Sequence, residues 1–352
     1  MKKFFISLIL MFVLVGCGTS APNTDGNTVL KLFNWGEYIG ENTIAEFESE
    51  YGVRVISSYY SSNEEMYVKL QAGEKFDVLI PSDYMIQRLI AEEQLQKIDI
   101  SQLENFDNIM SSLLDMPFDP ENEYSVPYLW GNVGIVYVKD KVDVADLDAD
   151  GWDILRNEKY RDRIFMYDSE RDGFMIALKA LGYSMNTEDP AELEAAYNWL
   201  LDMNSKTKPI YVMDEIIDQT LTEQKDLAVM YSGDAAYITS ENENLGFYVP
   251  QQQGTNIWLD SMVIPINAEN PELAMKFIDF VLEHEQALEI VNAVGYTTVV
   301  QSVFDEVTGA GGDYEDNNAF APVAGPKDEE FFYNADTRPI IADYWNKVKA
   351  SK

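Results

Sequence analysis

The feature that most restricts the fold of this chain is an alternation of short apolar runs with amphipathic stretches. Residues 29–33 form an apolar run of strand length, and residues 41–51 carry apolar side chains at helical spacing before Gly52. The strand predicted at residues 76–80 ends at Pro81, and Ser82 or Asp83 then caps a helix to about residue 95. Strand–helix–strand units of this length predict a parallel sheet with helices on both faces. A further strand and a further helix are predicted at residues 53–57 and 64–70.

A second unit of the same kind follows. The segment Asn270-Pro271-Glu272 indicates a helix start, and that helix is predicted to run to residue 294 and to stop at Gly295. Two α/β lobes with a ligand between them fit this pattern better than one continuous sheet. The other predicted strands span residues 134–138, 163–167, 226–231 and 261–266, and the helices span residues 152–156, 173–181 and 190–203.

The amino-terminal segment has the composition of an export signal. Lys2 and Lys3 precede a short apolar run at residues 4–13, and Leu14-Val15-Gly16-Cys17 follows. The last four residues resemble the lipobox of bacterial lipoproteins. That resemblance implies cleavage before Cys17 and a diacylglycerol on its thiol, so residues 1–16 are expected to be a signal peptide and residues 17–28 a lipidated tether. The alternative is an ordinary signal peptide with a chance cysteine.

Charge and composition exclude several classes of function. The chain carries 61 acidic and 25 basic residues, a net charge of −36, which repels nucleic acid and attracts cations. His284 is the only histidine, which argues against a catalytic histidine triad or a multi-histidine metal site. Cys17 is the only cysteine, so no internal disulfide can form. We expect no metal, no cofactor and no nucleic-acid partner.

Aromatic residues lie beside acids or amides where several predicted strands end. In open α/β sheets, ligands bind outside the carboxyl ends of the strands, so these side chains are expected to face one cleft. Taken singly, each has another explanation: Trp35 and Trp258 can be core residues, and the acids can cap helices or be solvated. The recurring groups are Trp35-Gly36-Glu37-Tyr38, Ser82-Asp83-Tyr84, Tyr231-Ser232-Gly233-Asp234, Trp258-Leu259-Asp260 and Gly295-Tyr296.

This combination of side chains suits an organic polycation. Aromatic faces pack against methylenes and attract an ammonium group by about 0.5–2 kcal/mol each. Carboxylates accept the ammonium hydrogens and balance a charge that is costly to bury unpaired. A sugar would require more Asn, Gln and Arg, and an anion would require Arg, Lys or free helix N-termini.

The chain resembles the spermidine/putrescine-binding proteins of polyamine ABC importers. The matching segments lie in one order over nearly the whole mature chain: FNWGEY at 33–38, YSSNEEMY at 60–67, VLIPSDY at 78–84, PFDP at 117–120, SVPYLWG at 125–131, LGYSMNT at 181–187, WLDS at 258–261 and GY at 295–296. The resemblance implies an α/β type II periplasmic-binding-protein fold, with two lobes, a hinge and an interlobe cleft. It places lobe 1 at residues 29–133 and 257–305 and lobe 2 at 134–256 and 306–352, with crossings near residues 132–136, 253–259 and 304–308.

The resemblance also implies the ligand site. Asp260 is expected to meet an inner amine and Asp172 a terminal one. Ser169 and Gly36 depart from residues common in the family, which leaves the choice between spermidine and putrescine open. The expected ligand-binding residues are Trp35, Glu37, Tyr38, Ser82, Asp83, Tyr84, Asp172, Tyr231, Trp258, Asp260 and Tyr296.

The predicted function is capture of a polyamine and its delivery to the permease subunits of an ABC importer. The protein is expected to be a monomer, not an enzyme, held outside the cytoplasm on the cell membrane by lipidated Cys17. Within the same class, the alternative ligand is another organic cation such as a basic amino acid. Alternatives from other classes are a two-carboxylate carbohydrate hydrolase and an acidic adhesin without a ligand pocket.

Substitution of the predicted lipidated cysteine tests the anchor. Cys17→Ala is expected to release the protein from membranes or to block its processing, because the thiol that carries the lipid is lost. Membrane fractionation and mass determination of the amino terminus measure both effects. A variant that stays in the membrane fraction and is cut at the same bond would show that Cys17 is not lipidated.

Overall fold

The computed structural model describes residues 28–36, 38–213 and 215–351. The predicted signal peptide, the predicted lipidation site Cys17 and all but the last residue of the predicted tether lie outside the described residues. Glu37 of the predicted ligand site also lies outside them.

The first strands form a parallel sheet, as predicted. Strand β1 (Val29–Trp35) lies between β2 (Arg54–Tyr60) and β3 (Val78–Leu79) and pairs with both in parallel. Helix α1 ends at Gly52, which adopts a left-handed conformation (φ 65°) that glycine reaches without strain. The Ser62 hydroxyl caps α2 by accepting a bond from the Glu65 N–H. The helices here are α1 (Glu41–Tyr51), α2 (Asn63–Gln71) and α3 (Asp83–Ala91).

The prediction of a purely parallel sheet is wrong at the centre of the molecule. Strand β4 (Ser125–Val138) is 14 residues long and runs antiparallel to β9 (Ile257–Val263). Its amino-terminal half pairs with β9, and its carboxyl-terminal half pairs with β7 (Leu227–Tyr231) and β8 (Leu245–Tyr248). The spacing of apolar residues does not indicate the direction of a strand. The strand predicted at residues 134–138 covers only the end of β4, and the one predicted at 261–266 overlaps only the end of β9.

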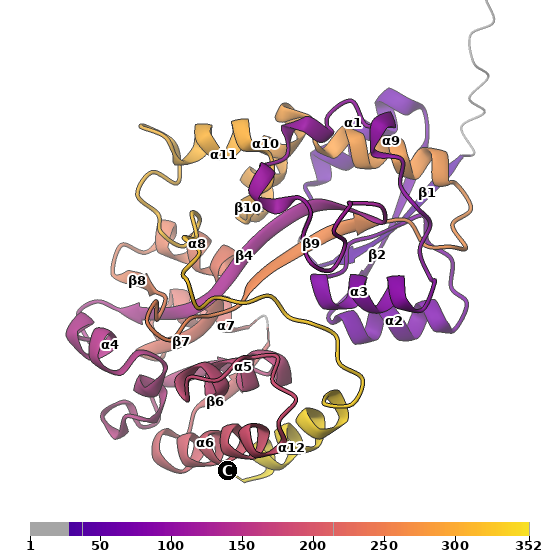
Figure 1. The fold of residues 1–352 in the computed structure, drawn as a ribbon. Coiled ribbons are helices and arrows are strands. Elements are labelled where there is room, and N and C mark those ends of the chain that lie inside the picture. The colour runs from indigo at the N-terminus through magenta and orange to yellow at the C-terminus, as the bar shows by residue number, and fades with distance from the viewer. Residues whose placement is uncertain (1–27, 37, 214, 352) are drawn as a thin grey trace, which may run out of the picture.

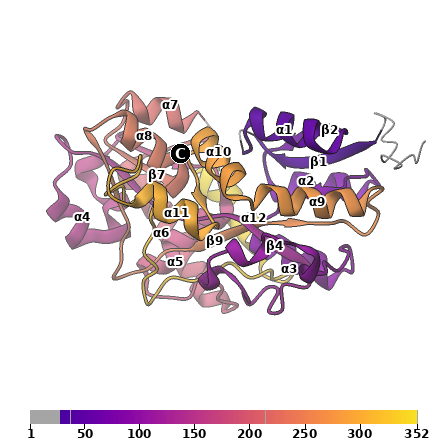
Figure 2. The same cartoon turned by 90° about the horizontal axis from the view of Figure 1, so that it is seen from above.

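The sheet order is β2-β1-β3-β9-β4-β7-β5-β6, with β8 and β10 (Thr297–Thr298) also paired to β4. Figures 1 and 2 show β4 and β9 running between two groups of helices. The second group surrounds β5 (Ile164–Tyr167) and β6 (Ile210–Val212), which are parallel to each other. Its helices are α4 (Val144–Asp150), α5 (Glu170–Ala180), α6 (Pro190–Thr207), α7 (Ile216–Leu221) and α8 (Ser232–Glu241), and short 3₁₀ helices span Ile100–Gln102, Phe106–Asn108, Ser111–Leu113, Gly151–Arg156 and Glu158–Tyr160.

The single helix predicted to reach residue 294 is two helices. Helix α9 (Pro271–Val281) ends at Leu282, and α10 (His284–Val294) begins after Glu283, whose backbone is extended (φ −63°, ψ 143°). Leu282, at the break between the two helices, is 1% exposed, so its side chain lies in the core. Neither glycine nor proline marks this break, whereas the predicted stop at Gly295 is confirmed by its left-handed conformation.

The carboxyl-terminal segment runs across the molecule. Residues 304–308, near which a crossing between the lobes is expected, lie within α11 (Gln301–Thr308), which packs on α10 and β10. After α11 the chain passes over the front of the molecule to α12 (Arg338–Ala350), which packs on α5 and α6 (Figure 1). We call residues 327–333 the strap.

The strap contacts both groups of helices. The Ile257 N–H donates to the Glu329 carbonyl (2.9 Å), and the Lys179 ammonium, on α5, donates to the Lys327 carbonyl (2.7 Å). The Tyr333 N–H donates to the side chain of Gln87 on α3 (2.7 Å). The strap is therefore fixed at the start of β9 and to helices of both groups.

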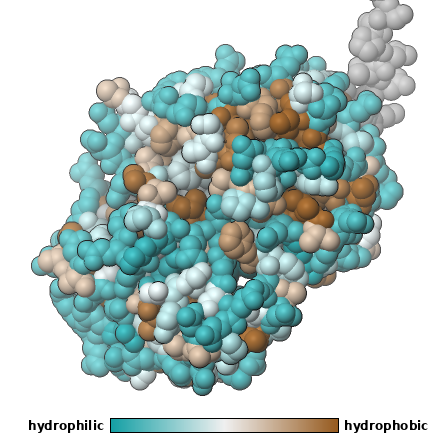
Figure 3. Space-filling model, in the orientation of Figure 1, coloured by the Kyte–Doolittle hydropathy of each residue, from teal (hydrophilic) through white to brown (hydrophobic). Residues whose placement is uncertain are grey.

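The face of the molecule shown in Figure 3 is largely hydrophilic, with hydrophobic side chains gathered mainly in its upper part. Within the described ranges, no helix has the length and apolarity that a bilayer span requires.

Candidate functional site

Asp260 lies at the centre of the predicted site. It lies on β9 and is 6% exposed, and its Oδ2 accepts a hydrogen bond from the Tyr38 hydroxyl (2.9 Å). Its Oδ1 is buried and accepts no bond from any described residue. Burial raises the pKa of Asp260 to about 6, and the neighbouring side chains of Ser82 and Tyr38 act in the opposite direction. A buried carboxylate oxygen without a donor is costly and is suited to receive an external N–H group.

Tyr38, which donates to this carboxylate, belongs to a cluster of aromatic rings. The Tyr296 ring lies edge-on to Tyr38, with centroids 5.2 Å apart, and 5.8 Å from Trp258. The Tyr231 ring is 6.3 Å from Trp258 and stacks on Tyr167 at 4.7 Å. The structure thus brings together four of the predicted aromatic residues and adds Tyr167.

Two glycines make room for these rings. A Cβ on Gly233 would lie 2.3 Å from the Tyr296 ring, and one on Gly131 would lie 2.5 Å from the Trp258 ring. Any side chain at either position would displace a ring of the cluster. The glycines at Ser232-Gly233 and Trp130-Gly131 therefore have a packing role that the sequence pattern did not predict.

Two further carboxylates are held by tyrosine hydroxyls. Tyr231 donates to Asp172 Oδ2 (2.7 Å), and burial raises the pKa of Asp172. Asp234 accepts from both Tyr296 (2.8 Å) and Tyr167 (2.5 Å). Asp172 was predicted as a ligand residue. Asp234 was not selected, although it follows a strand end just as the selected acids do.

A third group of acids lies on the side of Asp260 that faces α3 and the strap. Asp83 is fully buried, and its Oδ1 accepts from the Tyr84 N–H (2.6 Å). Asp83 Oδ2 and Glu330 Oε2 are buried and accept no bond from any residue that the structure describes. Burial raises the pKa of Asp83 well above its usual range, and the negative charges of Asp260 and Glu330 raise it further. These acids together favour a ligand with several cationic N–H donors.

Glu330 and Arg171 were missed by the sequence prediction. Glu330 lies in the strap and not at a strand end, so the pattern used to find site residues could not select it. The Arg171 guanidinium lies 3.3 Å from the centroid of the Tyr84 ring. Its position depends on a contact between α5 and α3 that periodicity does not reveal.

The remaining predicted residues have partners within the protein. The Trp35 indole N–H donates to the Ile80 carbonyl (2.9 Å) and its ring packs on Tyr60. The Ser82 hydroxyl accepts from Asn63 (3.0 Å), and its backbone pairs with Asp260. Trp35 is half-buried, so it combines the core role that the sequence allowed with partial exposure.

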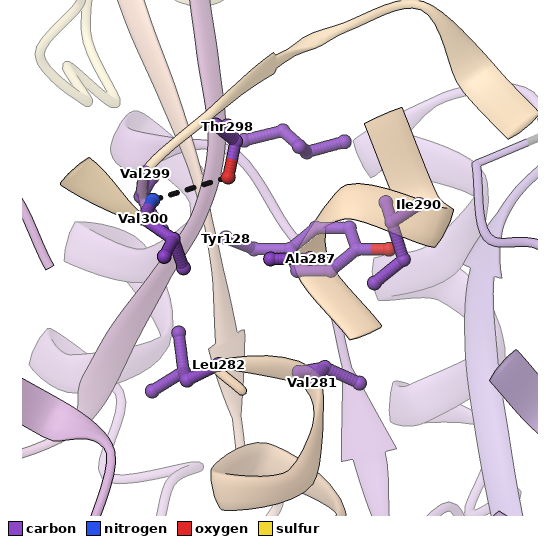
Figure 4. Close-up of a pocket in the computed structure, with 9 residues that line it drawn as sticks. Tyr128, Val281, Leu282, Ala287, Ile290, Thr298, Val299 and Val300 are labelled. Atoms are coloured by element: carbon purple, nitrogen blue, oxygen red, sulfur yellow. Dashed lines mark hydrogen bonds between the residues drawn. The ribbon is translucent and has the colours of Figure 1, made fainter. Parts of the chain in front are cut away.

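A small cavity beneath the site is a packing defect. It is lined by Tyr128, Leu282, Ile290 and Thr298 among others, and it measures about 10 Å³ (Figure 4). That volume is at the lower limit for one water molecule, and most of the lining side chains are apolar. Tyr128, which lines this cavity, also donates from its hydroxyl to the Tyr38 carbonyl (2.7 Å), so it helps to position Tyr38. Among the described residues no three His, Cys, Asp or Glu side chains are grouped to hold a metal ion.

Comparisons with known proteins identify the family of this chain. A family model described as "Bacterial extracellular solute-binding protein" matches residues 42–322. The spermidine/putrescine-binding periplasmic protein of Escherichia coli (strain K12) is 35% identical over 300 residues, 85% of each chain. The putrescine/cadaverine-binding protein of Pseudomonas aeruginosa is 32% identical over 312 residues, again 85% of each chain.

Solved structures confirm the predicted fold class. The spermidine/putrescine ABC transporter substrate-binding protein PotD of Streptococcus pneumoniae superposes with a TM-score of 0.78 at 34% identity, covering 92% of this chain and 99% of that one. The TpPotD lipoprotein of Treponema pallidum gives 0.79 at 26% identity, covering 91% and 99%. Relatives of this kind bind solutes and are not enzymes, as the sequence predicted. The chain belongs to the bacterial extracellular solute-binding proteins.

Proposed function

We propose that this chain binds a polyamine, spermidine or putrescine, and delivers it to the permease subunits of an ABC importer. The observation that carries the proposal is the buried, unpartnered Oδ1 of Asp260 beside the rings of Tyr38, Trp258 and Tyr296. The names of the relatives from Escherichia coli and Streptococcus pneumoniae support the same ligand class.

The chemistry of binding follows from these side chains. The aromatic faces pack against the methylenes and attract the ammonium groups. Asp260 accepts N–H bonds from an inner amine of the ligand, and Asp172 accepts them from a terminal amine. Asp83 and Glu330 are available to further ammonium groups. Glu37 belongs to the proposed site on the sequence alone. Ser82 contributes by holding Asp260 through their backbone pairing.

The ligand is proposed to enter between two lobes. The lobes are residues 29–133 with 257–305, and residues 134–256 with 306–352. The rings of Tyr38, Tyr296, Trp258 and Tyr231 touch one another, so an organic cation can enter only if they separate. Bending of β4 and β9 where they pass between the two groups of helices would allow this.

The protein is proposed to act as a monomer anchored on the outer face of the cell membrane, or in the periplasm, through lipidated Cys17. The export-signal composition of residues 1–16 supports this, as does the lipoprotein relative from Treponema pallidum. A basic amino acid is the alternative ligand, and arginine and lysine belong in every binding panel.

Asp260→Asn tests the ligand class, because it keeps the shape of the side chain and removes its charge. Loss of one partner of a buried charge pair costs about 2–5 kcal/mol, or about a hundredfold or more in affinity. We expect that loss for spermidine and putrescine by calorimetry at matched ionic strength. Asp107→Asn, at an exposed position, is the control. A folded Asp260→Asn protein that binds both ligands within about threefold of the parent would refute the assignment.

Binding is expected to weaken in acid. Putrescine keeps both charges between pH 5 and 8, since alkylammonium groups have a pKa near 10. The raised pKa of Asp260, about 6, means that this carboxylate is charged and binds fully above about pH 7. Affinity should fall as the pH drops through 6, by about tenfold per unit below it, because a proton then competes with the ligand. Calorimetry with putrescine across this range measures the effect. Asp260→Asn should make the profile less steep, and burial of Asp83, Asp172 and Glu330, which raises their pKa values too, accounts for the slope that remains. A parent affinity that is the same at pH 5 and pH 8 would contradict it.

Ligand binding is expected to close the lobes. A ligand that touches both lobes favours the closed state by those additional contacts. Small-angle scattering should show a smaller radius of gyration with saturating spermidine than without it. An unchanged radius at saturation would indicate a protein that is closed before binding or has no hinge.

A further inference from the structure

Glu64 is a carboxylate of proposed lobe 1 that pairs with two arginines of proposed lobe 2. It lies in the first turn of α2, which packs on β2. Arg171 Nη2, from α5, is 3.2 Å from Glu64 Oε1, and Arg338 Nη2, from the first residue of α12, is 3.8 Å from the same oxygen. Helices α5 and α12 pack on each other and on α6. The two ion pairs therefore join the proposed lobes through side chains alone, away from the crossing strands.

The pair of Glu64 with Arg171 is partly shielded from solvent. The Glu64 side chain is 33% exposed and that of Arg171 is 22% exposed. The guanidinium carbon of Arg171 lies 3.3 Å from the centroid of the Tyr84 ring and 5.5 Å from that of Phe331. Partial burial reduces the screening of an ion pair by salt, so this pair is stronger than a fully exposed one. Arg338 is 38% exposed and farther from the carboxylate, which makes it the weaker partner.

Other contacts between the proposed lobes lie beside these ion pairs. The Phe331 ring is edge-on to Tyr84, with centroids 6.5 Å apart, and the Tyr333 N–H donates to Gln87 Oε1 (2.7 Å). Phe331 and Tyr333 both belong to the strap, which Lys179 of α5 holds on lobe 2. All of these contacts require the lobes to be together, so they favour the closed arrangement over an open one.

Glu64 differs from the acids of the candidate site. Its charge is balanced by two arginines, and its side chain is partly exposed. Asp83 and Asp260, in contrast, are buried, and each has an oxygen without a donor among the described residues. A ligand ammonium is therefore attracted to Asp83 and Asp260 and not to Glu64. The position of Glu64 suits closure of the lobes without contact to the ligand.

We propose that Glu64, Arg171 and Arg338 form a latch between the lobes, which stabilises the closed arrangement and slows the escape of a bound polyamine. The inference rests on the proposed function and on the proposed lobes. A bound polyamine leaves only when the lobes separate, and the latch must break in that step. Because Glu64 does not contact the ligand, loss of the latch speeds dissociation by the same factor for every polyamine.

Glu64→Gln tests the latch, because it keeps the length of the side chain and removes its charge. Stopped-flow mixing followed by tryptophan fluorescence gives the dissociation rates of putrescine and spermidine at matched ionic strength. Both rates are expected to rise by about three- to tenfold, the effect of losing a partly buried ion pair. The ratio of the two rates should stay within about twofold of the parent value, since the ligand contacts themselves are unchanged.

Glu65→Gln is the matched control. Glu65 is the next residue of α2 and also lies in its first turn, so both variants remove one negative charge from the same helix end. Glu65 pairs with Lys69 of the same helix at 3.1 Å, and its side chain is 40% exposed. Its ion pair is thus local to α2, and both dissociation rates should stay within about twofold of the parent values.

A double-mutant cycle separates the latch from the other effects of Arg171. The Arg171 charge also lowers the pKa of Asp83 and of Asp172, against burial, so Arg171→Gln alone alters two acids of the candidate site. That direct effect is the same whether Glu64 is present or not. Arg171→Gln should therefore raise the dissociation rates by a smaller factor in the Glu64→Gln protein than in the parent.

Four outcomes would overturn the latch. They are unchanged rates in a folded Glu64→Gln protein, a faster rate for one polyamine only, the same acceleration in Glu65→Gln, and independent effects of Glu64→Gln and Arg171→Gln in the cycle. The second outcome would place Glu64 at the ligand.

Failure of the proposed function is recognised separately, because the parent would then bind neither polyamine. The latch is in that case judged without ligand, from the distance between spin labels on Asp107→Cys and Glu194→Cys in the Cys17→Ala protein. Both label positions are exposed, one in each proposed lobe. Glu64→Gln is expected to shift the distances to longer values, and an unchanged distribution would overturn the latch.

Discussion

The structure depends on the backbone pairing of one strand, β4, with two different sets of neighbours. Residues 125–132 of β4 bond to β9, and residues 133–138 bond to β7 and β8. Because antiparallel hydrogen bonds fix the register of both partners, the relative position of the two groups of helices is set by this one strand. The aromatic cluster lies where the pairing changes, so Trp258 on β9 and Tyr231 on β7 meet across the same few residues of β4.

The site combines groups that are individually unfavourable in a protein interior. Asp83, Asp172 and Asp260 are each at least nine-tenths buried, and burial raises the pKa of each. Tyrosine hydroxyls supply some of the hydrogen bonds that these buried carboxylates require: Tyr38 donates to Asp260, and Tyr231 donates to Asp172. The carboxylate oxygens that remain without donors are unsatisfied buried acceptors, which are costly to stability and are therefore expected at a functional site.

The sequence predicted those parts of the molecule that depend on local periodicity. The helix at residues 41–51, the helix that begins at Pro190 and the end of α10 at Gly295 follow from spacing and capping residues, and the structure has them there. Strand direction was wrong at β4 and β9, because antiparallel pairing between residues far apart in the chain leaves no local pattern. The break at Leu282 was missed because core packing, and neither glycine nor proline, ends the helix there.

For the site, the rule that ligands lie beyond strand ends brought together Tyr38, Trp258, Asp260 and Tyr296. The same rule did not find Arg171 or Glu330, because Arg171 lies in the first turn of α5 and Glu330 lies in the strap. Their contribution depends on tertiary contacts with Tyr84 and on proximity to Asp83.

The strap has a consequence for the order in which the protein matures. Every strand that the structure describes lies before residue 299, so the strands come before the strap in the order of the chain. Glu330, the Lys179 anchor point at Lys327 and helix α12 come only after that. The carboxylate cluster is therefore complete only when the strap is in place, and the same late segment also supplies the buried core side chains of Phe331, Trp345 and Val348.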